Sequence, residues 1–278
     1  MPELPEVETV RRGLVERFVG RRIAAVEVGR ERSVRRTSRE EVVARLVGAT
    51  AVAAERRGKY LLCPLDSGDV MMVHLRMSGQ LLAAPIGSRR PPHAHVVLLL
   101  ADGFEIRFVD PRTFGEVVVY DPRDARRVVP DVVALGVDPI VDGLDTARLR
   151  ALLRSSRRAV KALLLDQHVI AGIGNIYGDE ILHRARIQPR RPSDSIGPAA
   201  SARLAESIVS VLSEAIAAGG STLGDAQYVD LMGEGGSFQD AHRVYGRAGE
   251  RCPTCGRGRI VSGVVAGRTT CWCRVCQR

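Results

Sequence analysis

The chain has 278 residues, of which 45% are hydrophobic, so it is long enough to form two domains with a sizeable buried core. It contains no apolar run near the roughly 20 residues that span a bilayer, and its start, MPELPEVETV, lacks the regions of a signal peptide, so we expect a cytoplasmic protein that contacts no membrane. The net charge of +9 favours a nucleic-acid partner and the 4% aromatic content favours a duplex, although a solvated basic surface would carry the same charge.

The first half of the chain is predicted to be one helix followed by β-structure. A helix from Pro5 to Phe18 is indicated because apolar residues recur at steps of three and four, and Gly20 is placed to end it. Strands are predicted at Ala24–Val28, Tyr60–Leu65, Val70–Leu75, Val96–Leu100, Phe104–Val109 and Glu116–Tyr120. Asp102-Gly103 between two of these runs is typical of a hairpin. The pattern predicts an N-terminal helix with a β-sandwich or barrel.

The second half is predicted to be helical after a Pro-, Asp- and Gly-rich linker near Asp121–Asp145. Helices are predicted at Leu149–Leu153, Ala159–Asp166, Ile176–Ala185 and Ala199–Ala217. The Gly-containing segment Gln167–Asn175 separates the second helix from the third, which indicates a relative of the helix-turn-helix. The fold class is therefore α+β.

Four cysteines near the end form two CxxC pairs with 17 residues between them, which is close to the spacing of a structural zinc site. The pairs are Cys252 with Cys255 and Cys273 with Cys276. The segment between them is β-rich, so a β-hairpin zinc finger holding one Zn²⁺ is predicted. Four thiolates leave the ion no open position for chemistry, and disulfides would conflict with a cytoplasmic protein.

Pro2 offers unusual chemistry at the start of the chain. Removal of Met1, which a small second residue normally permits, would expose a secondary amine. The pKa of an α-amino group is near 8, compared with about 10.4 for lysine, so more of it is unprotonated at neutral pH. Its attack on a sugar C1′ would give an iminium ion that can drive elimination, with Glu3 moving protons at the ring oxygen. Proline and glutamate also serve simply to start a helix.

Two residue types are rare enough to single out the positions that keep them. Lys59 and Lys161 are the only lysines among 41 basic residues, and Asn175 is the only asparagine. A compact ammonium with rotatable donors does what a guanidinium cannot, so these lysines are candidate functional residues. Survival by chance under codon bias is the alternative.

Seven motifs occur in order along the whole chain. They are the MPELPEVETVRRGL start, Gly58–Leu62, His74–Gly79, Asp110–Gly115, Gly172–Tyr177, Val244–Arg247 and the paired CxxC tail. Together they resemble the bacterial formamidopyrimidine-DNA glycosylase family, also called 8-oxoguanine DNA glycosylases. The resemblance implies a β-sandwich domain, a helix-two-turn-helix domain and a zinc finger. It also implies a bifunctional base-excision repair enzyme, a DNA glycosylase with abasic-site lyase activity.

The resemblance implies catalytic roles at the N-terminal half. Pro2 would be the Schiff-base nucleophile, Glu3 the proton donor to the opening deoxyribose, and Lys59 a lysine near the sugar and phosphate of the lesion. The enzyme would remove oxidised purines, namely 8-oxoguanine and formamidopyrimidines, from double-stranded DNA. It would then nick the strand by β- and δ-elimination, acting as a monomer.

The remaining implied roles are contacts with DNA. Asn175 and Arg268 would bind phosphates around the extruded nucleotide, with Lys161 and His74 in support. Met77, Arg112 and Phe114 match the family's intercalating triad. A glycosylase must extrude its target base, and inserted side chains fill the space that the base leaves.

The resemblance also sets the expected domain limits. We expect a catalytic β-sandwich domain at 1–130, a linker at 131–148, a helix-two-turn-helix DNA-binding domain at 149–240 and the zinc finger at 241–278.

Two alternatives remain open. An endonuclease VIII-like enzyme would use the same terminus on oxidised pyrimidines, although MPELPE rather than an MPEG start favours purines. A non-enzymatic DNA-binding protein could keep the fold and the finger. Thr113, Ser237 and Gly178 depart from common family forms, where Arg, Tyr and Ala are frequent, and this leaves the lesion preference less certain.

Overall fold

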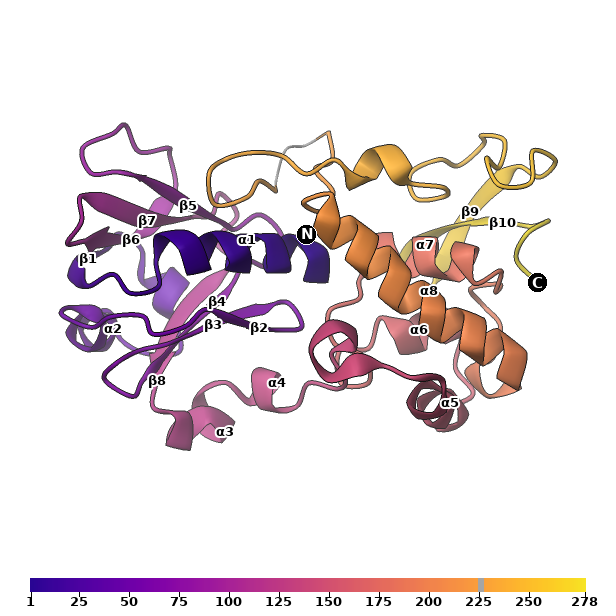
Figure 1. Cartoon of the computed structure of the whole chain (residues 1–278), viewed down its shortest axis with the longest axis horizontal. Helices are drawn as coiled ribbons and strands as arrows, with labels where there is room; N and C mark the ends of the chain where they lie inside the picture. The colour runs from indigo at the N-terminus through magenta and orange to yellow at the C-terminus, as the bar shows by residue number, and fades with distance from the viewer. Residues whose placement is uncertain (225–227) are drawn as a thin grey trace. The chain divides into compact units, whose positions relative to one another are not determined.

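A computed structural model describes residues 1–224 and 228–278 (Figure 1). The chain forms two compact units, and each is described by itself. The first comprises Met1–Ala134 and Ala218–Gln239, and the second comprises Leu135–Ala217 and Asp240–Arg278. The chain therefore leaves the first unit and returns to it once.

The first unit contains two antiparallel four-stranded sheets, as expected for a β-sandwich. One sheet has the order β1 (Ile23–Val28), β6 (Ala94–Leu100), β7 (Phe104–Val109), β5 (Gln80–Pro85). The other has the order β2 (Glu55–Arg57), β3 (Tyr60–Pro64), β4 (Val70–His74), β8 (Glu116–Tyr120). All six predicted strands are present, and β2 and β5 are additional. The hairpin predicted at Asp102-Gly103 joins β6 to β7.

Helix α1 (Leu4–Arg17) runs along the strands of this unit (Figure 1). Val7, Val10 and Leu14 are fully buried and belong to one apolar core with residues of both sheets. The predicted apolar face of this helix is thus confirmed. Helix α2 (Arg39–Leu46) was not predicted from the sequence; the Ser38 hydroxyl caps it by accepting a hydrogen bond from the Glu41 N–H.

The returning segment, Ala218–Gln239, is fastened to the rest of the first unit by backbone contacts. The Ala83 N–H donates to the Leu231 carbonyl at 2.7 Å, which extends the edge formed by β5. Gly13 on α1 faces Leu231 so closely that a Cβ there would lie 2.8 Å from the leucine Cβ. Close packing therefore requires glycine at this point of α1.

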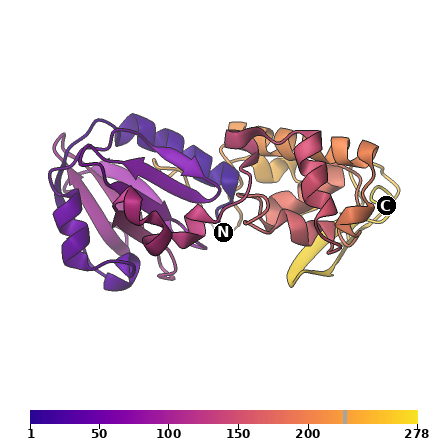
Figure 2. The ribbon, with the colours of Figure 1, turned by 90° about the horizontal axis from the view of Figure 1, so that it is seen from below.

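The second unit is helical with a C-terminal hairpin. Its helices are α5 (Thr146–Arg154), α6 (Val160–Leu164), α7 (Asn175–Arg184) and α8 (Pro198–Ala217), and its strands are β9 (Ile260–Val265) and β10 (Arg268–Cys273). The four predicted helices and the β-hairpin are confirmed. The tip of the hairpin projects beyond the helices of this unit (Figure 2).

Short helical turns occupy much of the segment that we predicted to be a linker. They are η2 (Pro122–Asp124), α3 (Ala125–Val128), α4 (Pro130–Val133) and η3 (Pro139–Gly143). The remaining short helices are η1 (Glu31–Val34), η4 (Ser193–Ser195) and η5 (Phe238–Ala241).

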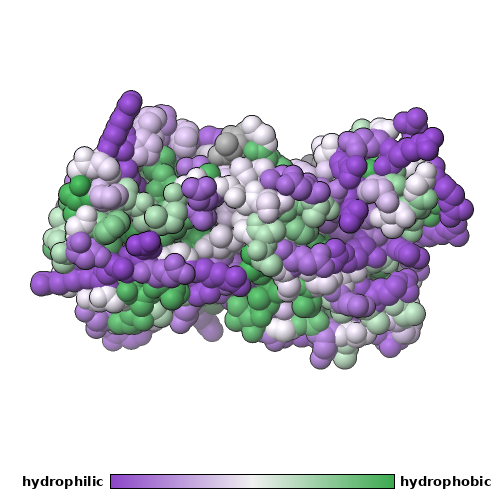
Figure 3. Space-filling model, turned by 45° about the horizontal axis from the view of Figure 1, so that its top comes forward, coloured by the Kyte–Doolittle hydropathy of each residue, from purple (hydrophilic) through white to green (hydrophobic). Residues whose placement is uncertain are grey.

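Polar and apolar side chains both reach the surface. Hydrophilic residues project from the face drawn in Figure 3 and are interspersed with smaller apolar areas. Among the residues that the structure describes, no helix has the length and apolarity needed to cross a membrane.

Candidate active site and nucleic-acid interface

Pro2 and Glu3 lie buried at the start of α1. Glu3 is the residue that caps the helix, and its N–H donates to Glu6 Oε2 at 2.7 Å. The other oxygen of Glu6 accepts from the Ser221 N–H at 2.8 Å. Gly220 has φ +80°, and a Cβ there would lie 2.7 Å from Glu6 Oε1. The Glu6 carboxylate therefore holds the start of α1, next to Pro2, against the returning segment. Glycine is required at position 220 because a side chain there would collide with this carboxylate.

Lys59 lies on a tight hairpin that is tied to the same helix. Arg57 pairs with Tyr60, so Gly58 and Lys59 form a two-residue turn between β2 and β3, and Gly58 has φ +57°. Arg56 donates to the Gly58 carbonyl at 3.0 Å and to Glu8 Oε2 at 3.2 Å. The candidate catalytic lysine is only 6% exposed. A salt bridge thus links the helix that begins near Pro2 to the turn that carries Lys59.

The charge state of Glu8 supports this link. Burial raises the pKa of Glu8, but the neighbouring Arg11 and Arg56 lower it by more, so its pKa lies below the ordinary value. The carboxylate therefore stays ionised at neutral pH. Sequence reasoning did not single out Glu8 or Arg56, because their pairing joins residues 48 positions apart.

His74 is buried at the end of β4 and is held as a neutral imidazole. Its Nδ1 accepts from the Arg76 N–H at 2.8 Å, which assigns the ring proton to Nε2. Burial, followed by the positive charges of Arg76 and Lys59, lowers the pKa of His74 well below its ordinary value. The Tyr60 ring contacts the imidazole edge-to-face at 4.3 Å. His74 can therefore offer one oriented N–H donor without carrying a charge.

Met77, Arg112 and Phe114, which we call the wedge residues, are exposed on two loops of the first unit. Met77 and Phe114 are each 40% exposed although both are large and apolar. The Arg112 guanidinium lies 4.9 Å from the centre of the Phe114 ring, in a cation–π arrangement. Exposed apolar side chains on a basic protein are suited to insertion into a duplex rather than to core packing.

Asp110 organises the loop that carries Arg112 and Phe114. Its Oδ1 accepts from the Ser78 hydroxyl at 2.6 Å and from the Arg112 N–H at 3.2 Å. Its Oδ2 accepts from the Gly115 N–H at 2.7 Å. A Cβ at Gly115 would lie 2.6 Å from the Phe108 ring and 2.9 Å from the His74 carbonyl. The Asp-Pro-Arg-Thr-Phe-Gly motif is thus a tightly built turn.

In the second unit, Lys161 is fully buried at the centre of a polar cluster that we call the Lys161 centre. Its ammonium donates to Asp179 Oδ1 at 2.6 Å, to Asn175 Oδ1 at 2.7 Å and to Thr270 Oγ1 at 2.9 Å. These three bonds match the three donors of an ammonium. These contacts explain why this position has a lysine in a chain that otherwise uses arginine, because a planar guanidinium would not match three acceptors around one nitrogen.

The Lys161 centre connects the two candidate phosphate ligands, Asn175 and Arg268. The Asn175 side chain also donates to the Thr269 carbonyl at 2.9 Å. The Thr270 hydroxyl, which accepts from Lys161, donates to the Arg268 carbonyl at 3.0 Å. Asn175 begins α7, and exposed Arg268 begins β10, directly after the turn at the hairpin tip. One buried lysine thus sets the relative positions of both residues.

The four cysteines meet at one point, as their spacing predicts. Their sulfur atoms all lie within 4.8 Å of one another, with 3.7 Å between Cys252 and Cys276 and 3.8 Å between Cys255 and Cys273. Zn–S bonds of about 2.3 Å in a tetrahedron place sulfurs about 3.8 Å apart. The cluster therefore has the dimensions of a four-thiolate metal site.

Two acidic residues on α7, which were not predicted from the sequence, hold the C-terminal tail. Glu180 accepts from the N–H groups of Arg243, Val244 and Tyr245 at 2.8–2.9 Å. The second oxygen of Asp179, Oδ2, accepts from the Cys271 N–H at 2.8 Å. The sequence feature that could have indicated this role is the adjacent pair Asp179 and Glu180 in α7, where most neighbouring residues are buried.

The three departures from the common family forms lie in different parts of the structure. A Cβ on Gly178 would lie 2.8 Å from Leu165 Cδ1, the end of a side chain directly after α6. Ser237 is exposed and its N–H donates to the Ala218 carbonyl at 2.9 Å. The third, Thr113, has φ +56° in the turn between Asp110 and Gly115.

Comparison with known proteins identifies the family. Residues 1–117 match the N-terminal domain of formamidopyrimidine-DNA glycosylase, and residues 135–227 match its H2TH domain. A formamidopyrimidine-DNA glycosylase from Geobacillus kaustophilus is 44% identical over 279 aligned residues that cover both chains completely. The chain belongs to the formamidopyrimidine-DNA glycosylase family. Its α+β fold, with the cysteine cluster and terminal hairpin, is the fold of that family, as the resemblance implied.

Solved structures of a family member include complexes with damaged DNA. A mutant of the Lactococcus lactis enzyme, bound to DNA containing a formamidopyrimidine lesion, has a TM-score of 0.90 at 35% identity, with full coverage of both chains. The wild-type L. lactis enzyme with DNA containing an oxidised pyrimidine has a TM-score of 0.89 at 35% identity, also with full coverage.

Proposed function

We propose that this chain is a DNA repair glycosylase that removes oxidised purines from duplex DNA and then cleaves the strand as a lyase. The observation that carries the proposal is the arrangement at α1. Buried Pro2 and Glu3 begin this helix, and the Glu8–Arg56 salt bridge ties it to the turn that bears Lys59. In a member of this family, that arrangement would supply a nucleophile, a proton donor and a cation within one compact unit.

The chemistry begins with removal of Met1, which frees the secondary amine of Pro2. The unprotonated nitrogen attacks C1′ of the damaged nucleotide, and the bond from C1′ to the base breaks with its electron pair leaving on the base. Glu3 transfers a proton to the sugar ring oxygen as the ring opens to the iminium ion. Loss of the C2′ proton then expels the 3′ phosphate, and a second elimination expels the 5′ phosphate. Hydrolysis of the remaining adduct restores the amine.

DNA binding is assigned to residues of both units. Lys59 and the Nε2–H of neutral His74 would contact the backbone at the lesion, and Asn175 and Arg268 would bind phosphates around the extruded nucleotide. The wedge residues would fill the space left by the extruded base, with Arg112 offering donors to the unpaired cytosine. We assign Lys161 to holding Asn175 rather than to direct phosphate contact, because it is fully buried.

One Zn²⁺ is proposed at the four-cysteine cluster, where it would stabilise the finger and take no part in catalysis. Four thiolates complete its coordination, so no position is left for a water or a substrate. We further propose that the protein acts as a monomer on double-stranded DNA. Its relatives are bacterial, which supports assigning it to the bacterial cytoplasm.

Borohydride trapping tests the proposal directly. Wild-type protein incubated with 8-oxoguanine opposite cytosine should form a covalent adduct, and Pro2→Gly should form much less because it lacks the secondary amine. Pro5→Ala is the matched control, since it removes a proline from the same helix start without touching the amine; it should trap as wild type does. Failure of the wild type to trap, or retention of Met1 in active protein by mass spectrometry, would overturn the proposed chemistry.

Oxidised pyrimidines are the second candidate substrate, and the L. lactis complex with an oxidised pyrimidine favours testing them. Excision should be compared between 8-oxoguanine opposite cytosine and thymine glycol opposite adenine. Faster excision of 8-oxoguanine supports the purine assignment. The opposite order contradicts it, and binding without excision of either lesion would identify a non-enzymatic DNA-binding protein.

A further inference from the structure

The loops that carry the wedge residues hold an unfavourable backbone conformation at matching places. Arg76, directly before Met77, has φ +53°, and Thr113, directly before Phe114, has φ +56°. Both values lie in the left-handed region, which residues with a Cβ seldom adopt. Neither residue is glycine, so surrounding contacts must hold the two loops in place.

Arg76 is fixed at both ends. Its N–H donates to His74 Nδ1 at 2.8 Å, and its guanidinium donates to Glu116 Oε1 at 3.2 Å. Glu116 begins β8 and pairs with His74, the last residue of β4. The residue before Met77 is therefore anchored to the neighbouring strand.

Two arginines from the η1 region hold the other loop through its carbonyl groups. Arg32 Nε donates to the Thr113 carbonyl at 3.1 Å. Arg35 donates to the Phe114 carbonyl at 3.2 Å and to the Gly115 carbonyl at 3.4 Å. Every carbonyl from Thr113 to Gly115 thus accepts from an arginine side chain.

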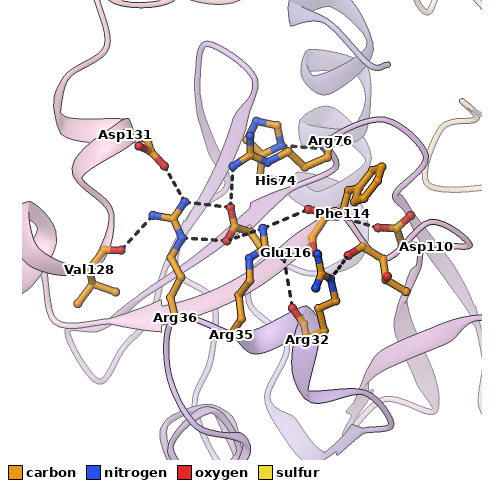
Figure 4. Close-up of polar contacts among 12 residues, drawn as sticks. Arg32, Arg35, Arg36, His74, Arg76, Asp110, Phe114, Glu116, Val128 and Asp131 are labelled. Carbon is orange, nitrogen blue, oxygen red and sulfur yellow. Dashed lines mark hydrogen bonds and ion pairs between the residues drawn. The ribbon is translucent and has the colours of Figure 1, made fainter.

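Glu116 joins these two sets of contacts (Figure 4). Its carboxylate is 0% exposed and lies 3.3 Å from Arg35, 2.8 Å from Arg36 and 3.2 Å from Arg76. Arg36 is anchored further by Asp131 at 2.7 Å and by the Val128 carbonyl at 3.0 Å. A single buried carboxylate therefore orients the arginine that holds the Phe114 loop and the arginine that precedes Met77.

We propose that Glu116 is a positioning residue that presets both wedge loops for insertion into the duplex. The proposal rests on the proposed function and adds to it the device that holds the wedge ready. Extrusion of a base breaks pairing and stacking, and it is favoured when the inserted side chains need no reordering. Without Glu116, three arginines lose the carboxylate that they share, and their positive charge is no longer neutralised by it.

This role predicts that loss of Glu116 slows the reaction on one substrate more than on another. In Glu116→Gln, excision of 8-oxoguanine opposite cytosine should slow by about tenfold to a hundredfold in single turnover, as expected for misplaced groups. Cleavage of a preformed abasic site should slow less than about threefold, because no base pair has to be opened. Affinity for undamaged duplex should stay equal or increase, since a negative group that neutralises arginines has been removed.

The chain offers a matched control in Glu105. This carboxylate on β7 is also 0% exposed and is bound by two arginines, Arg90 and Arg107. Arg107 holds the carbonyls of Ser88 and Arg89, so this network supports a loop without wedge residues. Glu105→Gln should therefore leave the ratio of lesion excision to abasic-site cleavage unchanged.

Insertion itself is measured with 2-aminopurine beside the lesion, whose fluorescence rises when the stack opens. The rise should be slower or smaller for Glu116→Gln and unchanged for Glu105→Gln. This readout needs no catalysis, so it still decides the proposal if the wild type proves unable to cleave DNA. Arg35→Lys, at a side chain that is 35% exposed, serves as a second variant and should show the same split if Glu116→Gln does not fold.

The results separate the alternatives. A selective loss on the paired lesion together with reduced 2-aminopurine signal supports the positioning role. Wild-type insertion and excision by Glu116→Gln, or equal losses on both substrates like those of a merely destabilised protein, would overturn it.

Discussion

Replacement of Lys161 with methionine should destabilise the second unit strongly. The substitution leaves Asp179 buried at 0% exposure without the ammonium that lies 2.6 Å away. An unpaired buried charge costs about 3–5 kcal/mol. Asn175 and Thr270 also lose their bond to Lys161, at about 1 kcal/mol each, while the apolar methionine offsets part of the loss. We expect a decrease of about 4 kcal/mol in the free energy of unfolding, as the buried charge dominates.

Urea unfolding followed by tryptophan fluorescence is the appropriate assay. Trp272 is the only tryptophan, and it follows Cys271, whose N–H is bound by Asp179. With a urea dependence of about 2 kcal/mol per molar, the midpoint should fall by about 2 M. Arg158→Met is the control because it breaks an ion pair with Asp166 of similar length, 2.8 Å, that is 37% and 26% exposed. It should cost less than about 1 kcal/mol.

A second substitution tests whether charge is the cause. Adding Asp179→Asn to Lys161→Met removes the orphaned charge and should recover part of the lost stability. Burial raises the pKa of Asp179 to about 6, so the comparison is made at about pH 7.5, where Asp179 is ionised in the wild type. Loss of Lys161 raises this pKa further, so the folded variant binds a proton that the unfolded chain does not, and its deficit should shrink as the pH falls. A deficit no larger than that of Arg158→Met, or one that grows at low pH, would refute the reasoning.

Three further predictions concern the rest of the molecule. Metal chelation, or Cys252→Ser, should weaken duplex binding and lower the thermal midpoint of the finger; unchanged binding by fluorescence anisotropy would contradict the role of the finger. The folded-state pKa of His74 lies below its unfolded value near 6.5, so the unfolded state binds more protons in acid and His74 should reduce stability below about pH 6.5. Denaturation at about pH 7.5 and about pH 5.5 should show a smaller acid loss for His74→Gln than for wild type. Burial raises the pKa of Cys63 to about 12, so a thiol reagent at about pH 8 should leave Cys63 unmodified in the folded protein, as peptide mapping would reveal.

The elements predicted correctly from the sequence are those in which apolar residues recur at a regular spacing. The helix that became α1, most strands of the sandwich and the terminal hairpin follow from apolar spacing and turn residues. Helix α2 was missed because its eight residues have only two buried side chains, Val42 and Leu46. Strand β5 was missed because its alternation is weak, and its pairing with β7 supplies the missing information.

In the candidate site, too, some residues could be predicted from local patterns and others could not. Motifs predict Pro2, Glu3, Lys59 and the four cysteines as site residues, because each belongs to a short segment with a characteristic pattern. The buried ion pairs and hydrogen bonds around the candidate residues join positions that lie far apart along the chain. Glu8 meets Arg56, Lys161 meets Thr270 and Glu116 meets Arg35, and no local pattern relates these partners.

The sequence by itself indicated the family, the basic charge, a proline at position 2 whose nitrogen would become a free amine if Met1 were removed, and four cysteines at the spacing of a metal site. Only the tertiary structure decided which buried charges are satisfied and by which partner. It assigned Lys161 to three acceptors and Glu116 to three arginines, and it brought Ser221 to Glu6. The physical reason is that periodicity and motifs depend on residues that are close along the chain. A buried charge, in contrast, must be paired with a group that is close in space, and that group can lie anywhere in the sequence.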